Sequence, residues 1–84
     1  MSGGHFDYRQ YHIQEIAETL DLDLTESAYV RDELSIETKE FMKETLYLLR
    51  DVAARVHALD YLLAGDIGED SLLEYYQSRK RNHE

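Results

Sequence analysis

The chain has 84 residues, with eighteen acidic and nine basic side chains and with neither cysteine nor proline. This length allows one domain at most, and the lack of cysteine excludes disulfides and thiolate metal sites. A net charge of −9 disfavours direct binding to nucleic acid or anionic lipid, because like charges repel, and it favours a basic partner. No hydrophobic run approaches bilayer length, and the opening residues lack the basic and apolar regions of a signal peptide. We therefore expect a cytoplasmic protein without membrane contact.

The first part of the chain is predicted to form an arm, a helix and a linker. Residues 1–7 include two adjacent glycines, which suit a flexible arm, and Asp7 can cap the helix that follows. We expect this helix to run from about Tyr8 to about Leu20, with residues 21–24 as its frayed end. Residues 25–35 are mostly polar and are expected to form a linker. The apolar positions at helical spacing are Ile13, Ile16, Ala17 and Leu20.

The strongest helical pattern runs without interruption from Ile36 to about Ala64. Ser35 is a suitable N-cap before it, and Gly65 suits the left-handed position that ends a helix. The apolar stripe of this helix is wider than a coiled-coil seam, and the first helix can cover only about half of it. We therefore expect a partner to cover the rest. The stripe consists of Phe41, Thr45, Leu48, Val52, Val56, Leu59 and Leu63, widened by Met42, Leu46, Leu49 and Ala53.

A short third helix is expected from about Ser71 to Lys80, after a turn in which Asp66 or Asp70 can act as the cap. Basic residues at its end are favourable beside the negative end of the helix dipole. Residues 82–84 are expected to form a disordered tail. The sequence thus predicts an all-α protein with a flexible N-terminal arm, a short helix, a long central helix and a short C-terminal helix.

Tyrosines on or beside the expected helices are the first candidates for binding a protein partner. Tyrosine combines apolar area with a polar hydroxyl group and is enriched at protein interfaces. The alternative is that these rings form the rim of a small core and keep their hydroxyl groups in water. The candidates are Tyr8, Tyr11, Tyr47, Tyr61, Tyr75 and Tyr76.

Acidic residues of the first helix and the linker are the second candidates. A row of carboxylates can imitate the phosphates of a nucleic acid and occupy a basic groove on a nucleic-acid-binding protein. Glu15, Glu18 and Asp21 are the residues expected to make that contact. The alternative is an ordinary solvated face that keeps the protein soluble.

Catalysis and cofactor binding have little support in the sequence. No carboxylate, histidine and nucleophile share one expected helix face, and no glycine loop is present to cradle a phosphate. We therefore expect neither an enzyme nor a cofactor. A weak zinc or nickel site from His5, Asp7 and His12 is conceivable. The alternative is that Phe6 and Tyr8 pin the arm onto the helices.

Two stretches of the chain carry a further signal. One is the opening Ser2-Gly3-Gly4-His5-Phe6-Asp7-Tyr8, and the other is the block Asp60-Tyr61-Leu62 followed by Gly65-Asp66-Ile67-Gly68-Glu69-Asp70-Ser71. Together they resemble a family of small uncharacterised proteins of bacteria and their phages that begin SGGHFDY. This chain departs from the family pattern at Tyr61, where the family has tryptophan, and at Leu72-Leu73, where it has an aromatic residue and a histidine.

The resemblance implies a phage or mobile-element setting and no particular activity. It also implies that the arm packs against the turn formed by residues 65–71. That packing would gather a polar and aromatic cluster made of His5, Phe6, Tyr8, Asp60 and Asp66.

Our leading hypothesis is a non-catalytic protein-interaction module that forms a homodimer through the stripe of the long helix. The first alternative is an acidic inhibitor from a phage that blocks the basic groove of a host defence protein, such as a CRISPR effector. The second alternative is weak metal or small-ligand binding through His5, Asp7 and His12.

Overall fold

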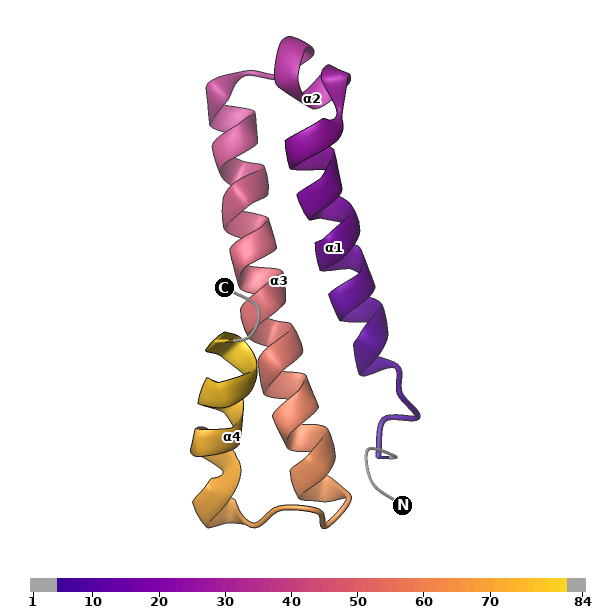
Figure 1. The fold of residues 1–84 in the computed structure, drawn as a ribbon, viewed down its shortest axis with the longest axis vertical. Coiled ribbons are helices and arrows are strands. Elements are labelled where there is room, and N and C mark those ends of the chain that lie inside the picture. The colour runs from indigo at the N-terminus through magenta and orange to yellow at the C-terminus, as the bar shows by residue number, and fades with distance from the viewer. Residues whose placement is uncertain (1–4, 82–84) are drawn as a thin grey trace.

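A computed structural model describes residues 5–81 of the chain, and all regular structure in that range is helical (Figure 1). The helices are α1 (Gln10–Glu26), α2 (Ala28–Glu33), α3 (Ile36–Leu63) and α4 (Glu69–Arg81). This confirms the predicted all-α class with a long central helix. The first four residues of the expected arm and the expected tail at 82–84 lie outside the described residues.

The start of α1 differs from the prediction. Asp7 does not cap the helix; the N-cap position is Arg9, which makes no side-chain capping bond. Asp7 and Tyr8 instead adopt left-handed φ values of 55° and 62°. The backbone N–H of Arg9 donates to the carbonyl of Phe6 at 3.1 Å, which closes a turn before the helix. Residues 6–9 are therefore a tight turn rather than an extended lead into the helix.

The predicted end of α1 near Leu20 is also wrong, because the helix continues to Glu26. Residues 21–24, expected to form a frayed end, are regular helix, and Leu24 lies one turn after Leu20 on its apolar side. The side chain of Asp21 accepts a hydrogen bond from Arg50 of α3 at 3.2 Å. This tertiary contact ties the last turns of α1 to α3, which a local reading of the sequence could not anticipate.

The expected linker at 25–35 contains the short helix α2. Ser27 caps α2 by accepting a bond from the backbone N–H of Val30 at 3.3 Å. Val30 is buried, so a single apolar side chain anchors the connection at the upper end of the molecule. This helix was not predicted because the segment is mostly polar and because six residues are too few to show a helical repeat of apolar positions.

The bounds of α3 agree with the prediction. Ser35 accepts a bond from the backbone N–H of Thr38 at 3.2 Å, as expected of an N-cap. Gly65 has a φ of 86° and donates to the carbonyl of Leu62 at 3.1 Å. The N–H of Asp66 donates to the carbonyl of Tyr61 at 2.8 Å, and this pair of bonds makes a Schellman motif. One unbroken helix therefore forms the spine of the protein.

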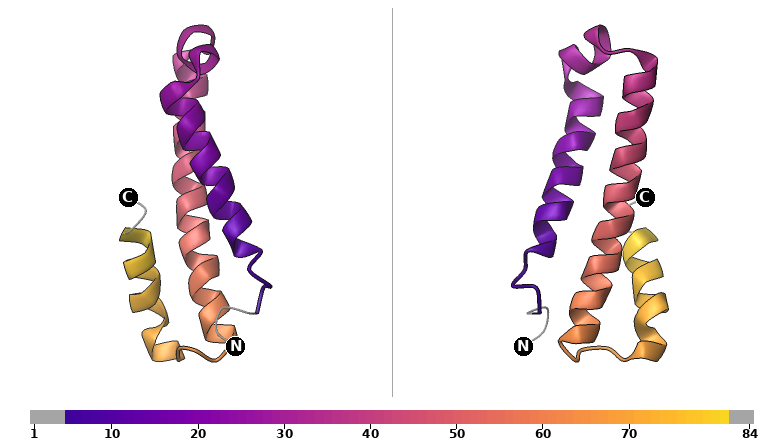
Figure 2. Two further views of the ribbon diagram at one scale, coloured as in Figure 1. Left: turned by 45° about the vertical axis from the view of Figure 1, so that its right-hand side comes forward. Right: turned by 180° about the vertical axis from the view of Figure 1, so that it is seen from behind.

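The helices lie in a single layer. Helices α1 and α4 flank α3 on opposite sides, and α4 ends about halfway along it (Figures 1 and 2). The molecule measures 47 × 22 × 15 Å, so its thinnest dimension is close to the 10–12 Å diameter of one helix with its side chains. The buried apolar residues are mostly alanines, which let the helices approach closely but bury little area: Ala17, Val30, Leu46, Ala53, Ala54 and Ala58.

Candidate interaction surfaces

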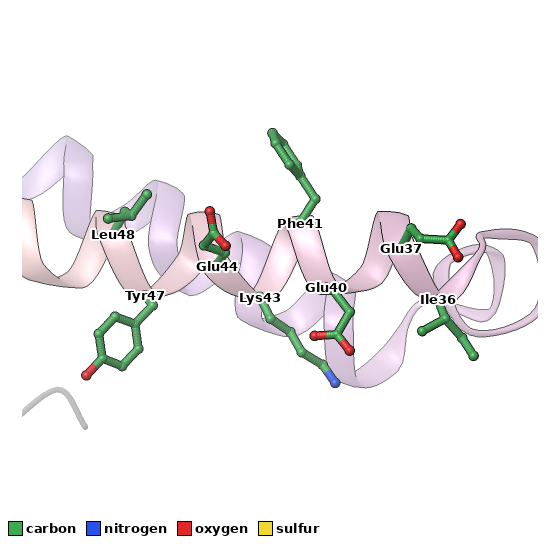
Figure 3. Close-up of a pocket in the computed structure, with 8 residues that line it drawn as sticks. All are labelled: Ile36, Glu37, Glu40, Phe41, Lys43, Glu44, Tyr47 and Leu48. Carbon is green, nitrogen blue, oxygen red and sulfur yellow. The ribbon is translucent and has the colours of Figure 1, made fainter.

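The stripe predicted along the long helix is present but is largely uncovered. Its members Phe41 and Leu48 are 70% and 57% exposed, and Val52 and Leu59 are also exposed. Figure 3 shows Phe41 and Leu48 projecting from the same side of α3. We call the surface formed by these and the other exposed residues of the stripe the open face; its members, all on α3, are Phe41, Leu48, Val52, Leu59 and Leu63.

The open face is uncovered because both neighbouring helices contact other sides of α3. Helix α1 contacts the side of α3 that carries Arg50 and Val56, and α4 contacts the side that carries Asp51 and Ala58. The buried residues of α3 include Ala53, Ala54 and Ala58. At 3.6 residues per turn, the open face falls between these two sides. The chain therefore leaves a row of large apolar side chains in solvent while alanines fill the contacts within it.

A hollow lies at one end of the open face, in the angle between α3 and α4. Its volume is about 180 Å³. Apolar side chains from both helices make most of its wall, and Leu73 is among the most exposed large apolar residues of the described chain. The lining residues are Arg55, Ala58, Leu59, Leu72, Leu73 and Tyr76.

Several of the predicted tyrosines meet around His57, at the end of the bundle where α1, α3 and α4 are all present. The ring of His57 lies 5.4 Å from that of Tyr11, 5.3 Å from Tyr61 and 6.3 Å from Tyr75, measured between centroids. Burial raises the pKa of Tyr75 to about 12, with a further contribution from its hydrogen bond with Tyr61. Tyr8 stacks on Tyr11 at 6.3 Å at the edge of this group. These rings link α1, α3 and α4 to one another.

His57 was not among the predicted residues, although it is buried at the centre of this aromatic group. A sequence signal was available: His57 falls four residues after Ala53 and four before Tyr61, on one row of the helix. The other two tyrosines lie elsewhere. Tyr47 is exposed on the side of α3 opposite Phe41 (Figure 3), and Tyr76 contacts Asp51.

The described part of the arm is attached through a buried carboxylate. Asp60 is 0% exposed, and its Oδ1 accepts a hydrogen bond from the backbone N–H of Phe6 at 2.9 Å. The ring of His5 packs edge-on against that of Phe6 at 4.8 Å. Of the cluster implied by the resemblance, the contact between Phe6 and Asp60 is therefore present.

A charged cluster fastens α4 to α3. The Asp51 carboxylate accepts bonds from the hydroxyl of Tyr76 and from Arg55 Nε at 2.8 Å, and Lys80 Nζ lies 3.4 Å away. The Tyr76 hydroxyl, followed by the Arg55 guanidinium, holds the pKa of Asp51 at about 2. The pairing of Asp51 with Arg55 follows from their i, i+4 spacing on one helix, whereas the contacts from α4 require the tertiary fold.

The three predicted acidic contact residues are not equivalent. Glu15 and Glu18 are exposed, whereas Asp21 is half-buried and bonded to Arg50. No group of three potential metal ligands occurs among residues 5–81, so His5, Asp7 and His12 do not assemble a three-ligand site there. None of the described helices has the length and apolar character needed to cross a membrane.

No protein-family model, curated protein or solved structure matches this chain. The resemblance to the family that begins SGGHFDY, and the phage setting it implies, therefore stay predictions.

Proposed function

We propose that this protein is a non-catalytic interaction module that forms a homodimer through the open face of α3. The observation that carries the proposal is the row of exposed large apolar side chains on an otherwise strongly charged protein. Scattered exposed apolar residues are normal on any protein, whereas contiguous ones mark interaction sites. On the basis of the sequence resemblance, we extend the proposal to a role in phage or host regulation. The cytoplasmic location that we propose for this role comes instead from the sequence pattern, which predicts neither a signal peptide nor a membrane span.

The single layer of helices supports the proposal that a partner supplies a second layer. Stable domains pack two layers of secondary structure around one core, because each helix must bury its apolar stripe against another element. The radius of gyration is 15.3 Å, compared with about 12 Å expected for a compact chain of this length. A second copy packed on the open face would supply the second layer and bury Phe41, Leu48 and Val52.

A homodimer is the simplest occupant for such a face. Closed two-fold dimers are the commonest protein oligomers, and they use the same patch on both subunits. The stripe steps from Phe41 to the half-buried Thr45 and on to Leu48 and Val52, alternating four and three residues, which is the repeat of a helix-pairing seam. The face therefore has the repeat needed to pair with a second α3.

The test is the mass of the protein in solution, measured by sedimentation equilibrium at micromolar concentration. We expect twice the mass of the chain, and a monomer throughout that range would overturn the proposal. Leu48→Glu is expected to give a monomer. Leu22→Glu is the matched control, because Leu22 is 56% exposed, nearly the same as Leu48, but lies on α1 and away from the open face.

A second candidate is binding of a basic partner through the outer surface of α1, as an inhibitor of a nucleic-acid-binding defence protein would do. Glu15 and Glu18 favour it because both are exposed and neither takes part in an ion pair within residues 5–81. Reversing both charges should abolish a salt-sensitive complex with such a partner and leave the dimer mass unchanged. Unaltered binding by the doubly reversed protein would remove this candidate.

A further inference from the structure

We propose that the two copies pack antiparallel, with Phe41 of each copy seated in the hollow beside Leu59 of the other. This inference rests on the proposed homodimer and adds the orientation and register of its partner. It follows from three features of the open face: the spacing of its residues, the position of the hollow, and the distribution of charge along its edge.

The spacing of the stripe is symmetric about the level of residue 50. Leu48 and Val52 lie equally far on either side of that level, and so do Phe41 and Leu59. A two-fold axis perpendicular to α3 at this level therefore brings Leu48 of one copy opposite Val52 of the other. The same axis brings Phe41 opposite Leu59, so four of the five residues of the open face meet another apolar residue, while Leu63 at its end lies level with Glu37 of the partner.

The hollow gives Phe41 a place to insert. Phe41 is the most prominent side chain of the open face, whereas Leu59 at 39% exposure is the least exposed and lines the hollow. The hollow has a volume of about 180 Å³. A protein cavity of about 150 Å³ accepts benzene, so this space is sufficient for a phenyl ring. Because of the two-fold axis, the insertion of Phe41 into the hollow of the other copy occurs twice in the dimer.

The charges along one edge of the open face decide between antiparallel and parallel packing. Glu44 lies on this edge beside Phe41 and Leu48, and Arg55 lies on it nearer to Leu59. A parallel dimer would set this edge against the opposite edge of the partner's open face, so Glu44 would not meet Arg55. An antiparallel dimer sets Glu44 of one copy level with Arg55 of the other. Arg55 is 62% exposed, donates Nε to Asp51 and lies over the Tyr76 ring at 4.9 Å, and its two terminal nitrogens keep donors for this contact.

Single cysteines at these two edge positions measure the orientation directly, because the natural chain has no cysteine. In the antiparallel dimer, position 44 lies beside position 55 of the partner. The two copies of position 44 are then about 18 Å apart along the helices, and the two copies of position 55 are about 15 Å apart, at 1.5 Å per residue. In a parallel dimer, this edge faces the opposite edge of the partner, so neither position lies close to position 44 or 55 of the other copy, and no pair reacts faster than another.

The experiment treats Glu44→Cys, Arg55→Cys and an equal mixture of the two with a short thiol cross-linker, after sedimentation has shown each to be dimeric. We expect the mixed pair to cross-link at least tenfold faster than either variant alone. Lys43→Cys, which points away from the open face in Figure 3, should cross-link with none of them. Faster cross-linking of each variant with itself, or equal rates, would overturn the antiparallel arrangement while the dimer stands. A monomeric natural protein would overturn the dimer itself.

Discussion

Truncation of Phe41 should weaken the dimer strongly and leave the monomer intact. A phenylalanine has about 150–250 Å² of surface, and at 70% exposure roughly 105–175 Å² remains for a partner to cover. At about 25 cal/mol per Å², complete burial is worth about 3–4 kcal/mol per copy. If Phe41→Ala loses a third of this value at both sites, the cost is about 2–3 kcal/mol. That cost corresponds to a dissociation constant roughly 30- to 140-fold higher, since 1.4 kcal/mol is a factor of ten.

Sedimentation equilibrium gives the dissociation constant, and far-ultraviolet circular dichroism checks that the helices are retained. Tyr47→Ala is the matched control, because Tyr47 is an aromatic residue with 59% exposure on the opposite side of α3. We expect this control to change the dissociation constant by less than about threefold, as is usual for residues outside the energetic centre of an interface. Equal weakening by the two substitutions, or none by Phe41→Ala, would refute the assignment of the interface to the open face.

The remaining predictions concern the fold that presents this face. Gly65→Ala should destabilise the protein by about 1–2 kcal/mol, because a Cβ there meets nothing within 4 Å and only the left-handed φ of 86° opposes it. Gly68→Ala should cost less, since its Cβ meets only the movable carboxylate of Asp70, and equal costs would argue against the backbone explanation. Loss of the cap in Ser35→Ala should cost about 1 kcal/mol, and an unchanged midpoint in denaturant unfolding would contradict it. Asp51 has a lowered folded-state pKa, so its contribution to stability should be lost as the pH falls from about 4 towards 2. Tyr75 has a raised folded-state pKa, so its contribution to stability should be lost as the pH rises from about 10 towards 12. The measurement for both residues is the free energy of unfolding as a function of pH. A flat profile in either pH range would contradict the role given to the residue that titrates there.

The features that the sequence predicted well depend on neighbouring residues alone. The long helix is specified by uninterrupted periodicity, by the cap at Ser35 and by the left-handed position at Gly65, and all three are present. The excess width of its stripe also predicted that large side chains would stay uncovered, and Phe41 and Leu48 are exposed. Local chemistry therefore decides both the spine of the fold and the surface proposed for binding.

The features that the sequence did not predict depend on contacts between distant segments. Helix α1 continues past Leu20 because its last turns are held against α3, in part by Asp21 and Arg50. The burial of His57 follows only from the approach of α1 and α4, whose tyrosines surround it. Asp60 is of a type that is rarely buried, and only the resemblance, not its own position in the helix pattern, placed it beside Phe6. Tyr47 and Tyr61 looked alike in sequence but differ in burial, because α4 reaches only the second of them.

The distribution of alanine and large apolar residues links the stability of this protein to its assembly. Alanines at 17, 53, 54 and 58 fill the contacts between helices, so folding of one copy buries little apolar area for the entropy it must offset. The larger side chains, Phe41 and Leu48 among them, contribute the free energy of apolar burial only when a partner covers them. Folding and dimerisation should then be coupled, and the thermal midpoint should rise with protein concentration. The monomeric Leu48→Glu variant should have a lower midpoint that does not depend on concentration. A concentration-independent midpoint in the natural protein would show that one layer of helices is stable alone, which would remove the physical reason for its exposed stripe to need a partner.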